Sequence, residues 1–397
     1  PGSLPVPTGG LPLSQLPYWR LSGFYFFYFA CLGILVPYWS LYLKWEGFSP
    51  SQIGELTAIL MGSRIIAPNI WGWIADHYDR RMRIVRLASF ATIIVFSAIF
   101  IEQSYLAVAI ILMLFSFFWN ASLPQVEVTT LQHLGEDSHY YSKVRLWGSI
   151  GFITIVVILG NLLEHFEPDI VPTALLFSVI GIWLFSLTVP ESAKTAHHQT
   201  TSLRTLLKRP SVIAFLLVCL LMQASHGPYY TFYTIYLEQY DYSSSLIGQL
   251  WALGVLAEVA IFLVMHRWLP KFGLRNVFMA SLLLTTLRWI LIALFPQNLT
   301  VLILAQLLHA ASYGSFHASA IAWVHRHFTG PTQGRGQALY SSASFGAGGV
   351  IGSLFSGYMW DSPGAIWTFL IASVFSFLGF VLAYRWLKES DRIQADE

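Results

Sequence analysis

Four ionisable residues interrupt long apolar stretches of this sequence, where a charge is costly. They are Arg64, Glu258, Arg288 and His309, and each lies near the middle of its stretch. A buried ionised group must find a partner or change its protonation state. Inside an apolar helix, such residues are therefore candidates for proton transfer or for recognition of a charged ligand.

Glu258 is the residue that we expect to carry a proton. Burial favours the neutral form of a carboxyl group, and a nearby guanidinium favours the ionised form. We expect Glu258 to be protonated when it faces outward and to lose the proton as Arg288 approaches. His309 could relay this proton, because free imidazole titrates near neutral pH. The alternatives are a permanent Glu258–Arg288 ion pair and a His309 that only hydrogen-bonds a neighbouring helix.

Arg64 has no acidic residue at its depth in the first half of the chain. An unpaired buried guanidinium is expensive, and a carboxylate satisfies it with two parallel hydrogen bonds. We therefore predict that Arg64 binds a substrate carboxylate. In the alternative interpretation, Arg64 pairs with Glu258 as part of a gate. Both interpretations hold if the substrate displaces the glutamate.

A second set of opposite charges, Glu127 and Arg145, lies nearer to the ends of two apolar stretches. We expect these two residues to pair with each other. They are either part of the substrate site or a structural lock between two helices, and both interpretations stay open.

Aromatic residues make up 16% of the chain. Their rings suit the face of an aromatic or sugar substrate, and tyrosine hydroxyls suit its polar edge. Most must pack or face lipid, so we select those beside expected helix breaks at Pro37 and Gly227-Pro228. His226, beside the second break, is either a substrate contact or a structural hydrogen-bonding group. The predicted aromatic contacts are Tyr25, Tyr28, Tyr38, Trp39, Tyr229, Tyr230 and Tyr233.

The composition indicates which elements position these residues. The chain is 55% hydrophobic and 11% charged, and soluble domains usually have about 25% charged residues. Apolar runs of about 20 residues recur, each long enough to cross a bilayer core as a helix. The two cysteines, Cys31 and Cys219, lie inside such runs. They indicate free buried thiols, not a disulfide framework or a metal site.

We predict an all-α membrane protein with twelve transmembrane helices. Residues 1–17 form an expected leader that is disordered or partly derived from cloning. Residues 18–189 and 211–386 form two six-helix bundles, 190–210 a cytoplasmic linker, and 387–397 a cytoplasmic tail. The predicted spans are 18–43, 50–73, 84–101, 105–131, 146–163, 170–189, 211–237, 243–265, 277–296, 299–324, 337–360 and 365–386.

The placement of positive charges tests this arrangement. If the N-terminus is cytoplasmic, all lysines and arginines except Lys44, Arg64 and Arg288 fall on the cytoplasmic side. Positive residues favour that side of a membrane. The pattern therefore predicts that both termini are cytoplasmic.

An internal repeat relates the two halves. Residues 48–58 read FSPSQIGELTA, and 242–252 read YSSSLIGQLWA, with six of eleven positions identical. Each copy starts an apolar helix after a serine. Arg64 of the first helix corresponds to Glu258 of the second. A basic residue in one half thus matches an acid in the other.

Six plus six helices with an internal repeat resemble a major facilitator transporter, whose halves enclose a central site and move about it. The stretch 72–83, GWIADHYDRRMR, is similar to the signature loop of that superfamily. Gly72, Asp76, Arg80 and Arg81 match it, whereas two other positions depart from it. We expect Gly72 to let two helices approach, and Asp76 to pair with arginines or cap a helix N-terminus. The alternative is a plain basic loop.

Further motifs resemble the phenylpropionate:proton symporter family. They are FYFFYF at 24–29, PYWSLYL at 37–43, SHGPYY at 225–230 and RGQALYS at 335–341. More distantly, the chain resembles the lactose permease family, whose sugar-binding Glu and Arg correspond to Glu127 and Arg145. Arg288 and His309 match that permease's proton-coupling Arg and His, but its coupling glutamate is replaced by Ser312.

These resemblances imply a proton-coupled symporter that works by alternating access. We expect its substrate to be a small aromatic carboxylate such as a phenylpropionate-like acid, and its location to be a bacterial inner membrane. The alternatives are a proton-coupled sugar, nucleoside or siderophore carrier, or a non-transporting membrane sensor. No P-loop, zinc spacing or nucleophile elbow is visible, so we expect no enzyme, cofactor or metal. The expected partners are the substrate and lipid, without nucleic acid, and the expected state is a monomer.

Overall fold

The computed structural model describes residues 17–78, 80–135, 140–191, 209–328 and 333–387, and every regular element in these ranges is a helix. The first half contains α1 (Tyr18–Trp45), α2 (Pro50–Tyr78), α3 (Arg81–Ser97), the 3-10 turn η2 (Ala98–Phe100), α4 (Tyr105–Trp119), α5 (Ser122–Leu134), α6 (Tyr141–Leu162) and α7 (Ile170–Thr188). The second half contains α8 (Pro210–Ser225), α9 (Gly227–Glu238), α10 (Ser244–Phe272), α11 (Leu274–Leu294), α12 (Leu299–Leu307), η5 (Ala310–Ser315), α13 (Phe316–His327), α14 (Gln333–Ser341), η7 (Ser342–Gly348), α15 (Gly349–Met359), η8 (Trp360–Gly364) and α16 (Ala365–Trp386).

The helices agree with the predicted class of an all-α membrane protein. Within the described ranges, 10 continuous helical stretches are long and apolar enough to cross a membrane. One of them, Gln333–Trp386, is 54 residues long and turns at Ser362, which has a non-helical backbone. Helix α2, 29 residues long, is not among these stretches. The count of twelve spans therefore stays a prediction.

The structure divides some predicted spans into two helices and continues another span through a predicted break. Span 105–131 is divided where α4 ends at Trp119 and α5 begins at Ser122. The predicted break near Gly227-Pro228 is confirmed, because α8 ends at Ser225 and α9 begins at Gly227. The expected break at Pro37 is wrong, since α1 continues through it. Neighbouring helices can accommodate a proline inside a membrane helix.

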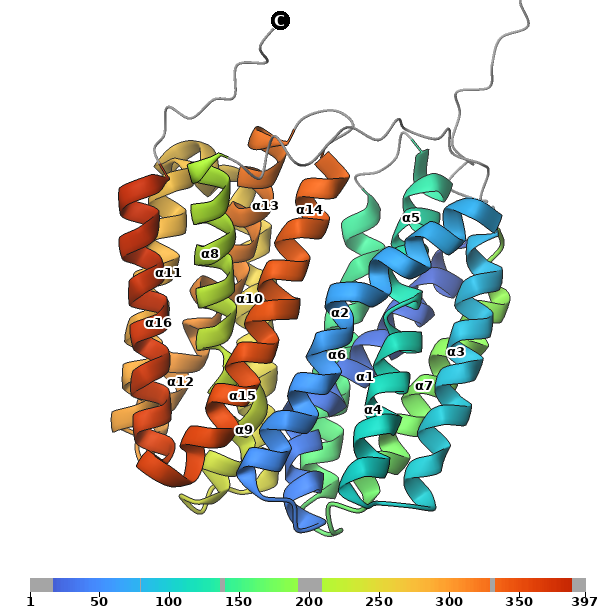
Figure 1. Ribbon diagram of the computed structural model, residues 1–397, viewed down its shortest axis with the longest axis horizontal. Helices are drawn as coiled ribbons and strands as arrows, with labels where there is room; N and C mark the ends of the chain where they lie inside the picture. Colours follow the sequence, from blue (N-terminus) through green and yellow to red (C-terminus); the bar gives the residue numbers. More distant parts are fainter. Residues whose placement is uncertain (1–16, 79, 136–139, 192–208, 329–332, 388–397) are drawn as a thin grey trace, which may run out of the picture.

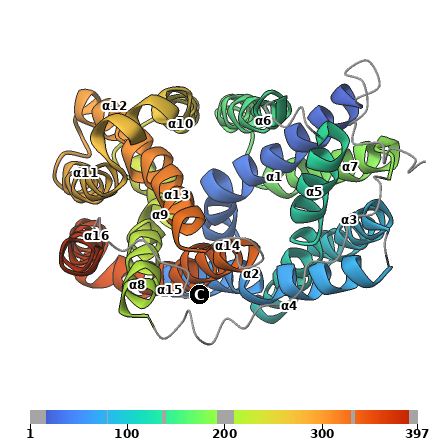
Figure 2. The same ribbon diagram turned by 90° about the horizontal axis from the view of Figure 1, so that it is seen from above.

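The predicted leader, linker and tail, at 1–17, 190–210 and 387–397, lie almost wholly outside the described residues. The predicted domain boundaries therefore stay predictions. The described helices nevertheless form two groups side by side, α1–α7 and α8–α16 (Figure 1). Seen from above, the same two groups lie on either side of a central region (Figure 2).

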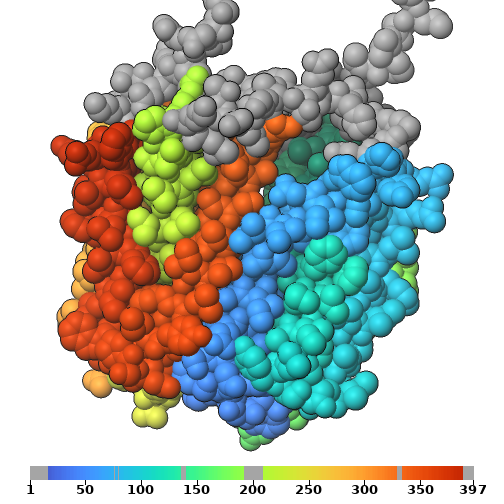
Figure 3. Space-filling model, viewed as in Figure 1, coloured from blue at the N-terminus to red at the C-terminus, as the bar shows by residue number. Residues whose placement is uncertain are grey.

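The two groups meet more closely at one end of the molecule. We call the end where α7 stops and α8 starts the linker end, and the end where α1 stops and α2 starts the far end. The ribbons lean apart toward the linker end and converge toward the far end (Figure 1). Across the boundary, α2 packs on α15, α6 on α10 and α1 on α9. The surfaces of α2 and α15 meet on the front face in Figure 3.

The repeated segment starts helices α2 and α10 with serine caps, as predicted. The Ser49 hydroxyl accepts the backbone N–H of Gln52 at 3.3 Å, and the Gln52 side chain accepts the backbone N–H of Ser49 at 3.0 Å. This reciprocal arrangement is a capping box. In the second half, the Ser243 hydroxyl accepts the backbone N–H of Leu246 at 3.3 Å.

Each copy of the repeat also supplies a glycine where the two halves touch. A Cβ atom on Gly54 would lie 2.7 Å from the Cα atom of Gly357 in α15. A Cβ atom on Gly160 in α6 would lie 3.3 Å from the Cα atom of Gly248. Larger side chains would separate these helices, so the glycines permit backbone contact between the halves.

Polar contacts add to this junction at the far end. The Ser245 backbone N–H donates to the Glu164 carboxylate at 3.0 Å, which joins α10 to the loop after α6. The Tyr358 hydroxyl of α15 donates to Glu55 of α2. The far end is therefore closed by small residues and by hydrogen bonds between the halves.

Candidate functional site

A cavity between the two halves brings together many of the polar residues singled out in the sequence. Its cavity volume is about 150 Å³. Helices α1, α2 and α6 form one wall, and α8, α9, α10, η5 and η7 form the other. A cavity at a domain interface, lined by aromatic and a few polar groups, is typical of a small-molecule site.

The charges on the two walls have opposite signs. Arg64 of α2 and Arg145 of α6 line the first wall, whereas Glu258 of α10 lines the second with His309. The Arg64 guanidinium carbon lies 5.9 Å from the ring centre of Trp119. Neither arginine forms an ion pair with any acid of the described chain. Two cationic groups thus face the cavity without a carboxylate partner among the residues that the structure describes.

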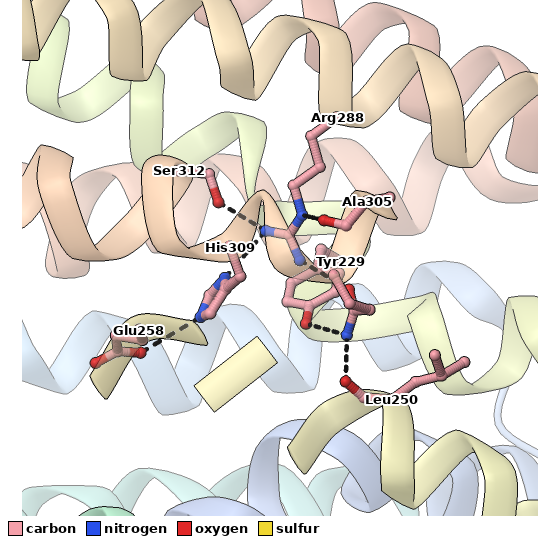
Figure 4. A network of polar contacts seen from close by, with 8 residues as sticks. Tyr229, Leu250, Glu258, Arg288, Ala305, His309 and Ser312 are labelled. Atoms are coloured by element: carbon pink, nitrogen blue, oxygen red, sulfur yellow. Dashed lines mark hydrogen bonds and ion pairs between the residues drawn. The ribbon is translucent and has the colours of Figure 1, made fainter. Parts of the chain in front are cut away.

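Arg288 lies behind the cavity wall and is fully buried, at 0% exposure. Its Nε donates to the Ala305 carbonyl at 2.8 Å, and its Nη2 donates to the Gln306 side-chain oxygen at 2.9 Å. Its Nη1 donates to the Ser312 hydroxyl at 2.7 Å and lies 3.0 Å from His309 Nδ1. Figure 4 shows these contacts converging on the guanidinium. The buried charge is therefore surrounded by acceptors rather than by a carboxylate.

The Arg288 guanidinium determines which nitrogen of His309 carries the proton. A guanidinium only donates hydrogen bonds, so His309 Nδ1 must accept. The ring proton therefore resides on Nε2, which lies 3.4 Å from Glu258 Oε2. His309 thus donates toward the Glu258 carboxylate and connects it to Arg288 (Figure 4). A doubly protonated His309 would place an N–H against the guanidinium.

This geometry excludes the alternative of a permanent Glu258–Arg288 ion pair, and a contact that forms only as Arg288 approaches stays a prediction. His309 lies between them, and the direct ion pair is not formed in this structure. Ser312, at the position of the permease's coupling glutamate, accepts a hydrogen bond from Arg288 instead. The two charges therefore communicate through a neutral imidazole.

We expect Arg288→Lys to destabilise the protein although it keeps the charge. A lysine ammonium cannot reproduce four contacts arranged around a planar guanidinium. Each interhelical hydrogen bond in a membrane protein contributes on the order of 1 kcal/mol, so the loss should be about 2–4 kcal/mol. Cys31 and Cys219 are buried free thiols, so a thiol-reactive fluorophore reports unfolding on heating. Arg326→Lys, at an exposed position, is the control, and equal unfolding curves for both variants would contradict the prediction.

Glu127 and Arg145 do not form the predicted pair. Glu127 accepts a hydrogen bond from the Tyr141 hydroxyl at 3.2 Å. The Arg145 guanidinium carbon lies 3.8 Å from the ring centre of Phe29. Their charges still interact at longer range. Arg145 lines the cavity, and Glu127 does not.

The predicted aromatic contacts divide into two groups. Tyr229 and Tyr230 line the cavity. The others are buried but do not line the cavity. Tyr25 hydrogen-bonds Thr130, Tyr28 stacks on Trp119, Tyr38 donates to the Val156 carbonyl, Trp39 packs on Phe96, and Tyr233 packs on Tyr229 and Trp251.

His226 is buried in the second half and does not reach the cavity. Its Nδ1 lies 2.8 Å from the carbonyl of Met222, one turn earlier. Its ring contacts the edge of Trp289, at 4.9 Å between ring centres. These contacts agree with the structural alternative for this residue.

The residues of the signature loop are spread over the linker end. A Cβ on Gly72 would meet no atom within 4 Å, so the expected close helix approach there is wrong. Arg80 is exposed, and Arg81 donates to Gln125 in α5. The side chain of Asp76 lies outside the described residues. The N-terminus of α3 is capped by Glu191, which accepts backbone N–H groups at 3.0 and 3.1 Å.

Gln306 was missed because an uncharged amide gives little signal inside an apolar run. Its amide nitrogen donates to the Tyr229 hydroxyl at 3.0 Å and to the Leu250 carbonyl at 2.8 Å, while its oxygen holds Arg288. It therefore connects α9, α10 and α11 beside the cavity. The one signal in the sequence that could have indicated Gln306 is its position about one helical turn before His309. Among the described residues, no cluster of His, Cys, Asp and Glu could hold a metal ion.

Comparison with known proteins gives a family for most of the chain. The model of the MFS_1 like family matches residues 18–371. A probable 3-phenylpropionic acid transporter of Escherichia coli (strain K12) is 27% identical over 368 residues, covering 90% of this chain and 95% of the relative. The maltose permease of Geobacillus stearothermophilus is 24% identical over 384 residues, covering 94% and 95%.

The fold also agrees with solved structures. The crystal structure of the nucleoside transporter NupG superposes with a TM-score of 0.77 and 19% identity, covering 93% of this chain and 98% of that chain. A bacterial homolog of the human lysosomal transporter Spinster, solved in an inward-facing and unoccupied conformation, gives a TM-score of 0.75 at 12% identity, covering 98% and 100%. Identities this low establish the arrangement of helices and nothing about a substrate.

Proposed function

Because this chain belongs to the MFS_1 like family, we propose that it is a proton-coupled symporter for a small organic acid. The proposed substrate is an aromatic carboxylate resembling phenylpropionate, carried by alternating access across a bacterial inner membrane. A relative of this chain is described as a probable 3-phenylpropionic acid transporter, which agrees with the proposal.

One observation carries the proposal: two arginines that pair with no acid in the described part of the chain line one wall of the cavity, and Glu258 and His309 line the other. Arg64 is the proposed clamp for the substrate carboxylate, because guanidinium and carboxylate groups form paired hydrogen bonds. Arg145 supplies a second positive charge. Tyr229, Tyr230 and Trp251, all at the cavity surface, are the proposed contacts of the aromatic ring.

The same charges suggest how a proton is coupled to the substrate. Protonation of Glu258 removes a negative charge from a cavity whose other wall carries Arg64 and Arg145. An anion should then bind more tightly. By linkage, the bound anion favours the protonated glutamate by the same factor. Proton and acid therefore load together, and loss of either favours release of the other.

The junction at the far end supports an alternating-access mechanism. We propose that the far end faces the outside, because the positive charges of the sequence favour a cytoplasmic linker end. Contacts such as Gly54–Gly357 and Gly160–Gly248 would then close the outer path. They must separate when the cavity opens outward.

Uptake into liposomes tests the proposal. Purified protein should carry labelled 3-phenylpropionate faster under an inward proton gradient than without one, with saturation. A pH dye inside the liposomes should report proton entry above that of protein-free liposomes. Protein-free liposomes are essential, since the protonated acid crosses lipid unaided.

Labelled uridine and maltose distinguish the alternative substrates in the same assay. The acid hypothesis predicts no saturable uptake of either neutral compound. Saturable uptake of one of them, without acid uptake, would replace the acid with a nucleoside or sugar. Saturable uptake of the acid at a rate independent of the proton gradient would contradict proton coupling but would still support the acid as the substrate class.

A further inference from the structure

A second hollow lies on the outer surface of the first half, near the linker end. Trp71 and Ile74 of α2, Leu87 of α3 and Phe118 of α4 form its walls. The groove has a volume of about 600 Å³ and is lined mainly by apolar side chains. The three helices that form this groove lie side by side (Figure 1). The groove is separate from the central cavity.

One wall of the groove is formed by Trp71, which contacts α4. The Trp71 indole nitrogen donates to the Phe117 carbonyl at 2.9 Å. The same ring packs on Phe117 and Phe118, with ring centres 5.4 and 6.0 Å away. Trp71 is therefore held against α4 instead of filling the groove.

Two arginines, Arg80 and Arg83, stand at one end of the groove. Both are exposed. Neither guanidinium contacts an acid, a carbonyl or an aromatic ring in the described part of the chain. The nearby carboxylate of Glu191 is occupied by the backbone N–H groups of Met82 and Arg83. The groove thus combines an apolar trough with two available positive charges.

We propose that this groove binds one anionic phospholipid, with its phosphate between Arg80 and Arg83 and an acyl chain in the trough. Arginine pairs readily with phosphate oxygens. Basic pockets between membrane helices are suited to anionic headgroups. An apolar trough alone would accept any lipid, so the two arginines supply the preference for negative charge.

The length of the groove fits a lipid in one leaflet. It extends along α3 from Arg80 to Ala91, which is about 16 Å at 1.5 Å per residue. One leaflet contributes about 15 Å of the bilayer's hydrocarbon core. The arginines would then lie at headgroup level, and Ala91 near the middle of the bilayer.

Native mass spectrometry of the full chain in detergent tests the site. Binding of the first phosphatidylglycerol should be at least about tenfold tighter than that of phosphatidylcholine, because the choline ammonium of the latter offsets the phosphate charge beside two guanidinium groups. The double variant Arg80→Gln/Arg83→Gln should lose this preference. The control, Arg267→Gln/Lys271→Gln, removes the same charge from the end of α10, the repeat-related helix, and should keep the preference. A preference that survives in the first variant, or disappears equally in both, would overturn the site.

Two further measurements distinguish the lipid from other occupants. Ala91→Phe should fill the trough and weaken binding of both lipids by several fold, about the effect of displacing a few methylene groups. Unchanged binding would contradict an acyl chain in the groove. Glycerol phosphate should not compete, and competition at the lipid's own concentration would assign a free-phosphate site instead.

Discussion

Net uptake driven by a proton gradient should fall at least about 100-fold in Glu258→Gln, because positioned proton-transfer groups typically contribute factors of this size. Glutamine resembles the protonated glutamate in shape but cannot release a proton. The variant should therefore bind substrate and exchange it across the membrane, yet fail to complete net cycles. Initial rates of net uptake and of exchange, each corrected for protein-free liposomes, measure the two processes separately.

The pH dependence of exchange gives a second readout of Glu258. In the wild type, exchange should slow as the pH rises and the carboxyl stays deprotonated. In Glu258→Gln, exchange should be independent of pH, since the titrating group is gone. Glu167→Gln, at an exposed position on the far end, is the matched control. If net uptake survives in Glu258→Gln, another group must carry the proton. If exchange is lost together with net uptake, Glu258 has a structural role instead.

Arg64→Gln should weaken binding of the substrate carboxylate by about 100-fold. A charge-assisted hydrogen bond contributes about 1.5–3 kcal/mol, and a factor of 100 corresponds to about 2.7 kcal/mol. Arg64 has no acid to satisfy it among the described residues, so its charge is available to the ligand. Binding to purified protein, measured by calorimetry at a pH below neutrality, gives the affinity directly.

A neutral ligand separates recognition of charge from the shape of the cavity. 3-Phenylpropionamide has the same ring and chain without the negative charge. Its affinities for wild type and for Arg64→Gln should agree within about twofold, because the contacts to the ring are unchanged. Arg145→Gln should weaken binding of the acid less than Arg64→Gln does, because the Arg145 guanidinium already contacts the Phe29 ring and interacts with the charge of Glu127. Equal affinity of Arg64→Gln and wild type for the acid would eliminate the clamp.

Much of the fold follows from local sequence signals. Apolar runs of sufficient length predicted most helices, and serine caps marked the starts of α2 and α10. The π-helical segments η5 and η7 were not predicted. They depend on how the chain packs beside the cavity, a tertiary property that a local pattern does not carry. The break before Ser122 was not predicted either, because it also depends on tertiary packing.

The sequence predicted which charged residues belong to the candidate site better than it predicted which of them contact each other. Charged residues in apolar runs directed attention to Arg64, Glu258, Arg288 and His309, and the structure places all of them in or beside the cavity. The order of contact was not predictable. Sequence spacing does not say that His309 separates Glu258 from Arg288, because this depends on how α10, α11 and α12 cross. The local sequence around each tyrosine also does not determine which tyrosines reach the cavity.

The split of the cavity between a cationic wall and an acidic wall has an evolutionary consequence. The positive groups belong to the first repeat, and the glutamate with its histidine and arginine belongs to the second. Substitutions in the first repeat that change the charge presented to the cavity would therefore leave the Glu258–His309–Arg288 contacts of the second repeat in place. After duplication of an ancestral half, the two copies could thus have diverged in the sign of the charge that each presents to the cavity.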